Sequence, residues 1–230
     1  MPKLPARLPL TMARLACRHV RANIQSTNQG GFVLENQHYQ SRGEQKSTIA
    51  LRSRNEHFFH QYATHLANQK SIPETQQILS MLYFESHLAL LSGVGNCDEM
   101  SAAAFIFLYR CQLSPLDLLM ISYKYKPFPS LDMTPSVESE YHHKFVVIGR
   151  PLDSTLENPA SWGKQAVLCD PWSDLAMPVA NCQDFILNQQ TELQFFSIQP
   201  MIRSDDQQLS LQISTNRTAT DEDEFLAIDQ

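Results

Sequence analysis

Cysteine is scarce in this sequence, and the patterns missing around it exclude several classes of protein. The 230 residues include five cysteines, Cys17, Cys97, Cys111, Cys169 and Cys182. They form no CxxC pair, and their odd number argues against a disulfide scaffold, so we expect a reducing compartment. Cysteines and histidines also lack zinc-finger or HExxH spacing. We therefore expect no metal site, and no cofactor.

Long apolar runs and a strong net charge are also missing. The longest apolar stretches, such as residues 88–91 and 145–148, are far too short to cross a bilayer, so we expect no transmembrane segment. The first residues lack an apolar stretch followed by a cleavage site, so no signal peptide is expected. The net charge is −6, and no basic stripe carries interleaved aromatics. The sequence thus predicts a soluble protein that does not bind nucleic acid.

Charges are distributed unevenly along the chain, and this suggests three parts. Residues 1–34 contain five basic and no acidic residues, whereas residues 204–230 contain seven acidic residues and one basic residue. We interpret residues 1–50 as a basic N-terminal segment, partly ordered or packed on the core, in which residues 8–24 form an amphipathic helix. A targeting or membrane-surface role is the alternative for this segment. Residues 51–200 form the main domain, and residues 201–230 an acidic C-terminal tail.

The middle of the chain reads as helices followed by strands. Helices are predicted at residues 56–69, 74–91 and 97–112. Strands are predicted at residues 116–123, 143–149, 165–169 and 193–198. This order favours an α+β fold with helices packed against an antiparallel sheet. Cys111 falls on the apolar stripe of the third helix, so we expect it to be buried and inert.

A glycine-rich turn delivers Cys97 to the start of that third helix. A helix N-terminus lowers the pKa of a thiol and can hold a developing oxyanion. Asn96 is a favourable N-cap. Asp98 and Glu99 suit the helix dipole but disfavour a neighbouring thiolate, so activation requires an imidazolium partner. The plainer interpretation of Cys97 is a small buried residue.

A histidine and an aspartate stand at the ends of two predicted strands. His143 opens one strand and shares a face with Phe145, while His142 faces the other way. Asp170 ends the next strand and precedes a proline and Trp172. A carboxylate in that place can accept a proton from imidazole and fix its tautomer. The plainer interpretations are an ordinary polar strand residue and a turn-forming Asp-Pro pair.

Together the three motifs resemble those of a known enzyme superfamily. Gly-Asn-Cys97-x-Glu, His143-x-Phe-Val-Val and Asp170-Pro-Trp172 follow the chain order of transglutaminases, and papain-like folds share the Cys-then-His order. Over residues 56–200 the chain resembles the papain/transglutaminase-like Cys-His-Asp enzymes found among secreted bacterial effectors and toxins. The resemblance implies a papain/transglutaminase-like fold and a catalytic triad of Cys97, His143 and Asp170.

The resemblance also implies a reaction and a setting. The reaction is thiol-dependent acyl transfer on protein amides through a Cys97 thioester, as in a glutamine deamidase or transglutaminase. No glutamine lies between Gln77 and Cys97 to serve as the papain-type oxyanion donor, which leaves Asn96 and the backbone N–H of Cys97. Trp172 is expected to pack beside the triad and shield it from water.

An effector of this kind is made in the bacterial cytoplasm and translocated into a host cell, where its substrate is a host protein. A regulatory protein partner is compatible with that setting. Two other functions stay open at this point. One is a papain-like cysteine protease, and the other is a non-catalytic protein-binding module in which Cys97 is structural.

Overall fold

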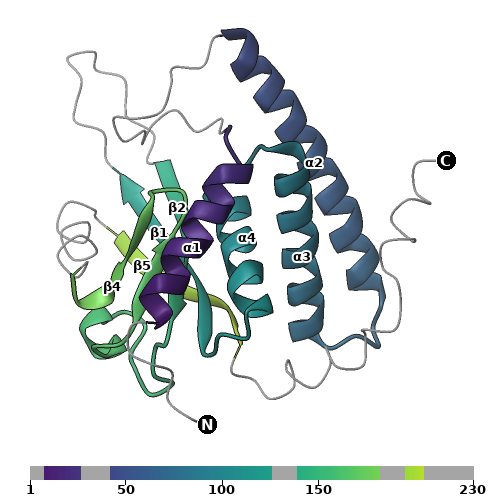
Figure 1. Cartoon of the computed structure of the whole chain (residues 1–230). Helices are drawn as coiled ribbons and strands as arrows, with labels where there is room; N and C mark the ends of the chain where they lie inside the picture. Colours follow the sequence, from purple (N-terminus) through teal and green to yellow (C-terminus); the bar gives the residue numbers. More distant parts are fainter. Residues whose placement is uncertain (1–7, 27–41, 126–138, 182–194, 205–230) are drawn as a thin grey trace, which may run out of the picture.

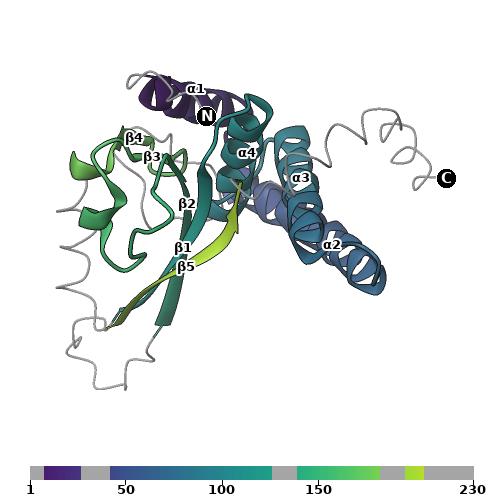
Figure 2. The same cartoon turned by 90° about the horizontal axis from the view of Figure 1, so that it is seen from below.

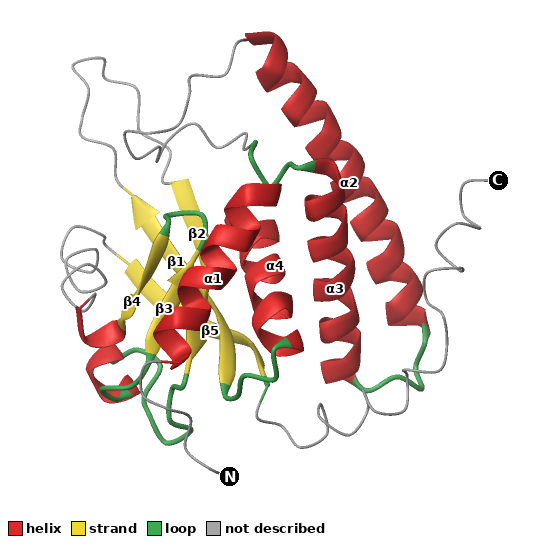
Figure 3. Ribbon diagram, viewed as in Figure 1, coloured by secondary structure: helices red, strands yellow, loops and turns green. Residues whose placement is uncertain are grey.

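A computed structural model describes residues 8–26, 42–125, 139–181 and 195–204. The helices are α1 (Leu8–Asn23), α2 (Arg42–Asn68), α3 (Glu74–Ser92), α4 (Cys97–Arg110) and the short 3-10 helix η1 (Pro159–Trp162). The strands are β1 (Leu116–Tyr125), β2 (Ser139–Ile148), β3 (Val167–Asp170), β4 (Leu175–Pro178) and β5 (Phe195–Arg203). Figure 3 shows helices beside a single sheet, which confirms the predicted α+β architecture.

The five strands form an antiparallel sheet in the order β4-β3-β2-β1-β5. β1 and β2 pair along their whole length, from Leu116↔Ile148 to Tyr125↔Ser139. β3 is short and pairs with β2 only from Val146 to Ile148. The half of β2 that carries His143 therefore extends past the end of β3, and one of its edges is left free of strand pairing with β3.

The long helices all lie on one face of the sheet (Figures 1 and 2). α1 and α4 pack on the strands, α3 packs on α4, and α2 packs on α3. Side chains alternate along β2, so Val146 and Ile148 join the core beneath the helices. Phe145 and Val147 join a second core on the opposite face, covered by Trp162 from η1.

α4 is the central helix of the fold and is buried almost all round. Ten of its 14 residues are buried, which is the pattern of a helix enclosed by the core rather than of one with a single apolar stripe. Its small residues, Ala102, Ala103 and Ala104, allow close packing against its neighbours. The prediction that Cys111 is buried was wrong. α4 ends at Arg110, and Cys111 is the exposed residue that caps it.

The described helices and strands do not follow the boundaries expected from charge. The expected division between residues 50 and 51 falls inside α2, and β5 continues through Arg203 past residue 200. α1 lies in the same core as the main domain, with Ala13, Ala16 and Val20 fully buried. Residues 205–230, the greater part of the acidic tail, are outside the described residues. None of the described helices is both long enough and apolar enough to cross a membrane.

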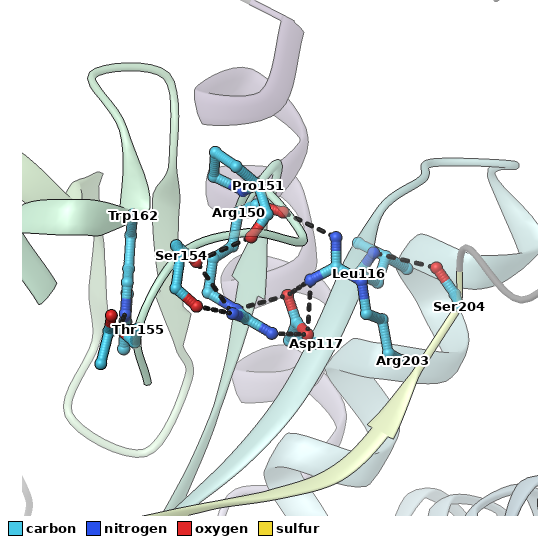
Figure 4. Close-up of polar contacts among 9 residues, drawn as sticks. All are labelled: Leu116, Asp117, Arg150, Pro151, Ser154, Thr155, Trp162, Arg203 and Ser204. Carbon is cyan, nitrogen blue, oxygen red and sulfur yellow. Dashed lines mark hydrogen bonds and ion pairs between the residues drawn. The ribbon is translucent and has the colours of Figure 1, made fainter. Parts of the chain in front are cut away.

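A buried ionic network ties three segments together at the end of the sheet opposite His143 (Figure 4). The carboxylate of Asp117, on β1, is fully buried. Arg150 donates to both its oxygens, at 3.1 and 2.7 Å, and Arg203 of β5 lies 3.0 Å from each. Arg203 also donates to the backbone carbonyl of Arg150 at 2.8 Å. These charge-assisted bonds fix β1, β5 and the end of β2 relative to each other.

Asp117→Ala should strongly destabilise the protein, because it leaves two guanidinium groups without their shared carboxylate. Removing one partner of a buried ion pair costs about 3–5 kcal/mol, and urea denaturation measures the loss. Ser154→Ala is the control, because the Ser154 hydroxyl accepts from Arg150 at the margin of this network and donates to the carbonyl of Pro151 outside it. Equal losses for the two variants would contradict a central role of Asp117.

Candidate active site

The N-terminus of α4 positions Cys97 through a tight turn after α3. Asn96 and Glu99 form a capping box, in which the backbone N–H of Asn96 donates to Glu99 Oε2 at 2.9 Å. Gly95 has to be glycine here, because a Cβ atom would lie 3.0 Å from Glu99 Cβ and 3.2 Å from Ile24 Cγ2. Cys97 is the first helical residue and is only 3% exposed.

One short hydrogen bond holds this helix end against β2. Ser101, one turn after Cys97, donates from Oγ to the backbone carbonyl of Lys144 at 2.6 Å. The Cys97 sulfur then lies 3.9 Å from the carbonyl oxygen of His142. The thiol therefore sits against the part of β2 that β3 leaves uncovered.

His143 and Asp170 are joined by a direct contact. The Nε2 atom of His143 lies 2.8 Å from Asp170 Oδ2, and the aspartate side chain is 5% exposed. The other carboxylate oxygen of Asp170 accepts from the backbone N–H of Ser173 at 3.2 Å. Since Nε2 is engaged with Asp170, Nδ1 is the imidazole nitrogen left for the thiol.

The surroundings of His143 favour its protonated form. Burial lowers the pKa of His143, but the charge and hydrogen bond of Asp170 raise it, as do the hydrogen bond and charge of Cys97. The net effect raises the pKa of His143 to about 10. At neutral pH the imidazole is therefore a cation beside Cys97, and such a neighbour stabilises a thiolate.

Aromatic rings and α1 support this arrangement. The Trp172 ring lies 5.4 Å from the His143 ring, and the Phe145 ring lies 6.2 Å from it. Arg21 of α1 donates from Nη1 to the carbonyl of Pro171 at 3.1 Å. α1 thus holds the turn that follows Asp170. Arg21 was not predicted to take part in the site, because its only signal in the sequence is membership of a basic segment.

The structure brings Cys97, His143 and Asp170 together and directs the side chain of His142 away from them. His142 Nδ1 lies 2.8 Å from the Ser122 hydroxyl, on the helix-facing side of the sheet. Asn96 is 1% exposed, and its side chain accepts from the backbone N–H of Glu99 in the capping box. In the structure Asn96 therefore supports the turn that carries Cys97.

Both acids that follow Cys97 have cationic partners. Asp98 Oδ1 lies 3.1 Å from Lys144 Nζ, and Glu99 Oε1 lies 3.1 Å from Arg52 Nε. Sequence reasoning missed these two cations, since they come from β2 and α2. The only signal was strand alternation, which places Lys144 on the face opposite His143.

The residues of both ion pairs line a cavity of about 320 Å³. It lies between α2, α3 and the sheet, and Asp98, Lys144 and Glu85 are among its lining residues. Burial is the largest cause of the raised pKa of Glu85, which reaches about 7, and Lys144 opposes that rise. The cavity is therefore lined in part by an acid that is half-protonated near neutral pH.

Within the described residues, no group of three or more histidine, cysteine, aspartate or glutamate side chains is placed to hold a metal ion. Comparison with protein-family models, with curated proteins and with solved structures finds no match. Any functional assignment therefore depends on the geometry of this site and on the sequence motifs that form it.

Glu85→Gln should stabilise the protein at high pH and not at low pH. The unfolded chain loses its Glu85 proton near pH 4.5 and the folded protein near pH 7, so stability falls as pH rises through this interval. The gain from the neutral glutamine should grow by about 2 kcal/mol between pH 5 and pH 8. Urea denaturation at both values measures it, with exposed Glu157→Gln as control. A gain that does not change with pH would contradict the buried, proton-holding state of Glu85.

His143 should remain protonated well above neutral pH, because Asp170 and Cys97 stabilise its imidazolium. Titration of its ring proton by NMR should give a pKa near 10, and Asp170→Asn should lower that value by removing the largest favourable charge. Asp153→Asn, which changes an exposed acid elsewhere, should leave the titration unchanged. A His143 that titrates near 6.5 in the unmodified protein would show that the contact with Asp170 is not made in solution.

Proposed function

We propose that this protein catalyses thiol-dependent acyl transfer on protein amides, with Cys97 as the nucleophile. The observation that carries the proposal is the contact between His143 Nε2 and Asp170 Oδ2 at 2.8 Å, on an imidazole whose pKa Cys97 also raises. A thiol, an imidazole and an orienting carboxylate in series are the groups that nucleophilic catalysis by cysteine requires.

In the first half of the reaction, the Cys97 thiolate attacks the carbonyl carbon of a substrate amide. The tetrahedral intermediate collapses to a thioester as the C–N bond breaks. The imidazolium of His143 donates its proton to the departing amine, while Asp170 keeps the ring oriented. The high pKa of His143 suits this role, because the ring already carries the proton at neutral pH.

In the second half, an acceptor resolves the thioester. His143, now neutral, takes a proton from the attacking water or amine, and Cys97 leaves as a thiolate. The oxyanion of each tetrahedral intermediate lies near the positive end of α4, where the backbone N–H of Cys97 has no partner within the helix. Asn96 contributes by holding that helix end, and Trp172 beside the imidazole restricts access of water.

The kind of fold and the kind of acyl transfer are proposed from the motifs around Cys97, His143 and Asp170. A helix-borne thiol, a strand-borne imidazole and a carboxylate on the next strand support a papain/transglutaminase-like fold. Within it we propose a glutamine deamidase or transglutaminase-like activity on a host protein, by a translocated bacterial effector. This reaction uses side chains of the chain alone, with no metal or cofactor in any step.

Cys97 should react with iodoacetamide at pH 6, where ordinary thiols with a pKa near 8.5 are almost inert. The imidazolium of His143 is the reason, because it stabilises the thiolate. Intact mass after labelling, followed by peptide mapping, measures the reaction. Cys111 is exposed and can compete for the label, so Cys111→Ser is the background for the assay.

In that background, Cys97→Ala should abolish both the fast label and all acyl transfer while the fold persists. Ammonia release or amine incorporation without new chain termini supports the proposed activity, whereas new termini indicate a cysteine protease. In the parent protein, which keeps Cys111, a Cys97 that is labelled no faster than Cys111 at pH 6 contradicts the proposal. It would identify the 3% exposed thiol as a packing residue in a non-catalytic binding module.

A further inference from the structure

The residue directly after Cys97 places a negative charge beside the thiol. Asp98 Oδ1 lies 4.0 Å from Cys97 Sγ, within reach of a weak S–H donor. Two like charges at such a distance repel by about 1 kcal/mol in water and by several kcal/mol in a less polar site. An uncompensated Asp98 therefore opposes the thiolate that acyl transfer needs.

Lys144 meets this carboxylate from the neighbouring strand. Its Nζ lies 3.1 Å from the same oxygen, Asp98 Oδ1, that approaches the sulfur. The Lys144 side chain is 20% exposed, and its own backbone carbonyl is held by Ser101 at 2.6 Å. Lys144 is thus held at its backbone carbonyl by Ser101 and at its ammonium group by Asp98.

The lysine keeps its charge in this place. Burial lowers the pKa of Lys144, but Asp98 and Glu85 outweigh it and raise the value above that of an ordinary lysine. Its charge is therefore constant across the pH range in which a cysteine titrates.

We propose that Lys144 is a positioning residue that keeps the Cys97 thiol reactive by neutralising the charge of Asp98 beside it. The role rests on the proposed function, because it presumes that Cys97 is the nucleophile. Lys144 acts through Asp98 and touches neither the substrate amide nor the leaving group.

The other charged groups near the thiol do not supply this neutralisation. The charge of His143 is opposed by Asp170, to which it is bonded at 2.8 Å. Arg52 from α2 is held by Glu99 and by Glu56, at 3.1 and 2.9 Å. Glu85 from α3 is an acid and brings no positive charge. Within the part of the chain that the structure describes, Lys144 is the cation paired with Asp98.

The alternation of side chains along β2 explains how one cation reaches the thiol region from each face of the sheet. His143 and Lys144 are adjacent on β2, so their side chains leave opposite faces of the sheet. His143 approaches Cys97 from the face that holds Asp170, and Lys144 reaches Asp98 from the face toward the cavity. The two cations thus flank the first turn of α4.

The experiment is the pH–rate profile of Cys97 alkylation by iodoacetamide in the Cys111→Ser background. Lys144→Met keeps the length and apolar stem of the side chain but removes its charge. It should slow alkylation at pH 6 by roughly tenfold and move the profile upward by about one pH unit. Lys144→Arg, which keeps the charge, should stay close to the parent protein. Lys164→Met, at an exposed site elsewhere, should have no effect.

A second pair of variants tests whether Lys144 acts through Asp98. In an Asp98→Asn background there is no charge to neutralise, so adding Lys144→Met should cause no further slowing, and the double variant should recover most of the parent rate. A tenfold loss that persists in the double variant would overturn the proposal, as would a Lys144→Met profile equal to that of the parent. If Lys144→Met does not fold, the single variant Asp98→Asn decides alone. The proposal requires Cys97 in that variant to alkylate at least as fast as in the parent, because the opposing charge is gone.

These results are distinguishable from failure of the proposed function. If Cys97 is not a nucleophile, the parent protein alkylates slowly at pH 6 whatever stands at position 144. If only the role of Lys144 is wrong, the parent keeps its fast reaction and the variants leave it unchanged.

Discussion

The site depends on the hydrogen bond from Ser101 Oγ to the backbone carbonyl of Lys144, because it joins the start of α4 to β2. At 2.6 Å it is shorter than the Asp98–Lys144 ion pair between the same two elements, and Ser101 itself is fully buried. The bond fixes one turn of helix against one residue of strand. Cys97 then comes to lie at the strand edge, close enough to His143 to raise the pKa of its imidazole.

Because this contact places Cys97 at the edge of β2, two neighbouring residues of that strand can act near one thiol from opposite faces of the sheet. A strand sends successive side chains to opposite faces, so His143 goes toward Asp170 and Lys144 toward Asp98. The short length of β3 is a condition for this arrangement. Had β3 continued along β2, its backbone would occupy the edge against which the thiol lies.

The sequence predicted the local features of the site well, since each is encoded within a few residues. A glycine turn, an N-cap and an apolar helix place Cys97 at a helix start, and an apolar strand ending in an acid places Asp170. A feature that depends on distant pairing was missed, because β4 contains half-buried residues without alternation. The amphipathic helix expected at residues 8–24 corresponds to α1, which packs in the core through small alanines. The buried position predicted for Cys111 failed because periodicity does not reveal where a helix ends.

Each end of the β1–β2 pair has an aspartate paired with basic side chains, buried at one end and partly exposed at the other. At the far end, Asp117 is 0% exposed and is bound by two arginines, so its contacts hold strands together. At the site, the side chain of Asp98 is 37% exposed and is bound by one lysine. Solvent screens this ion pair more strongly than the buried one, so the far end contributes more to holding the β1–β2 pair in place, and the pair at the site contributes the charge balance beside the thiol.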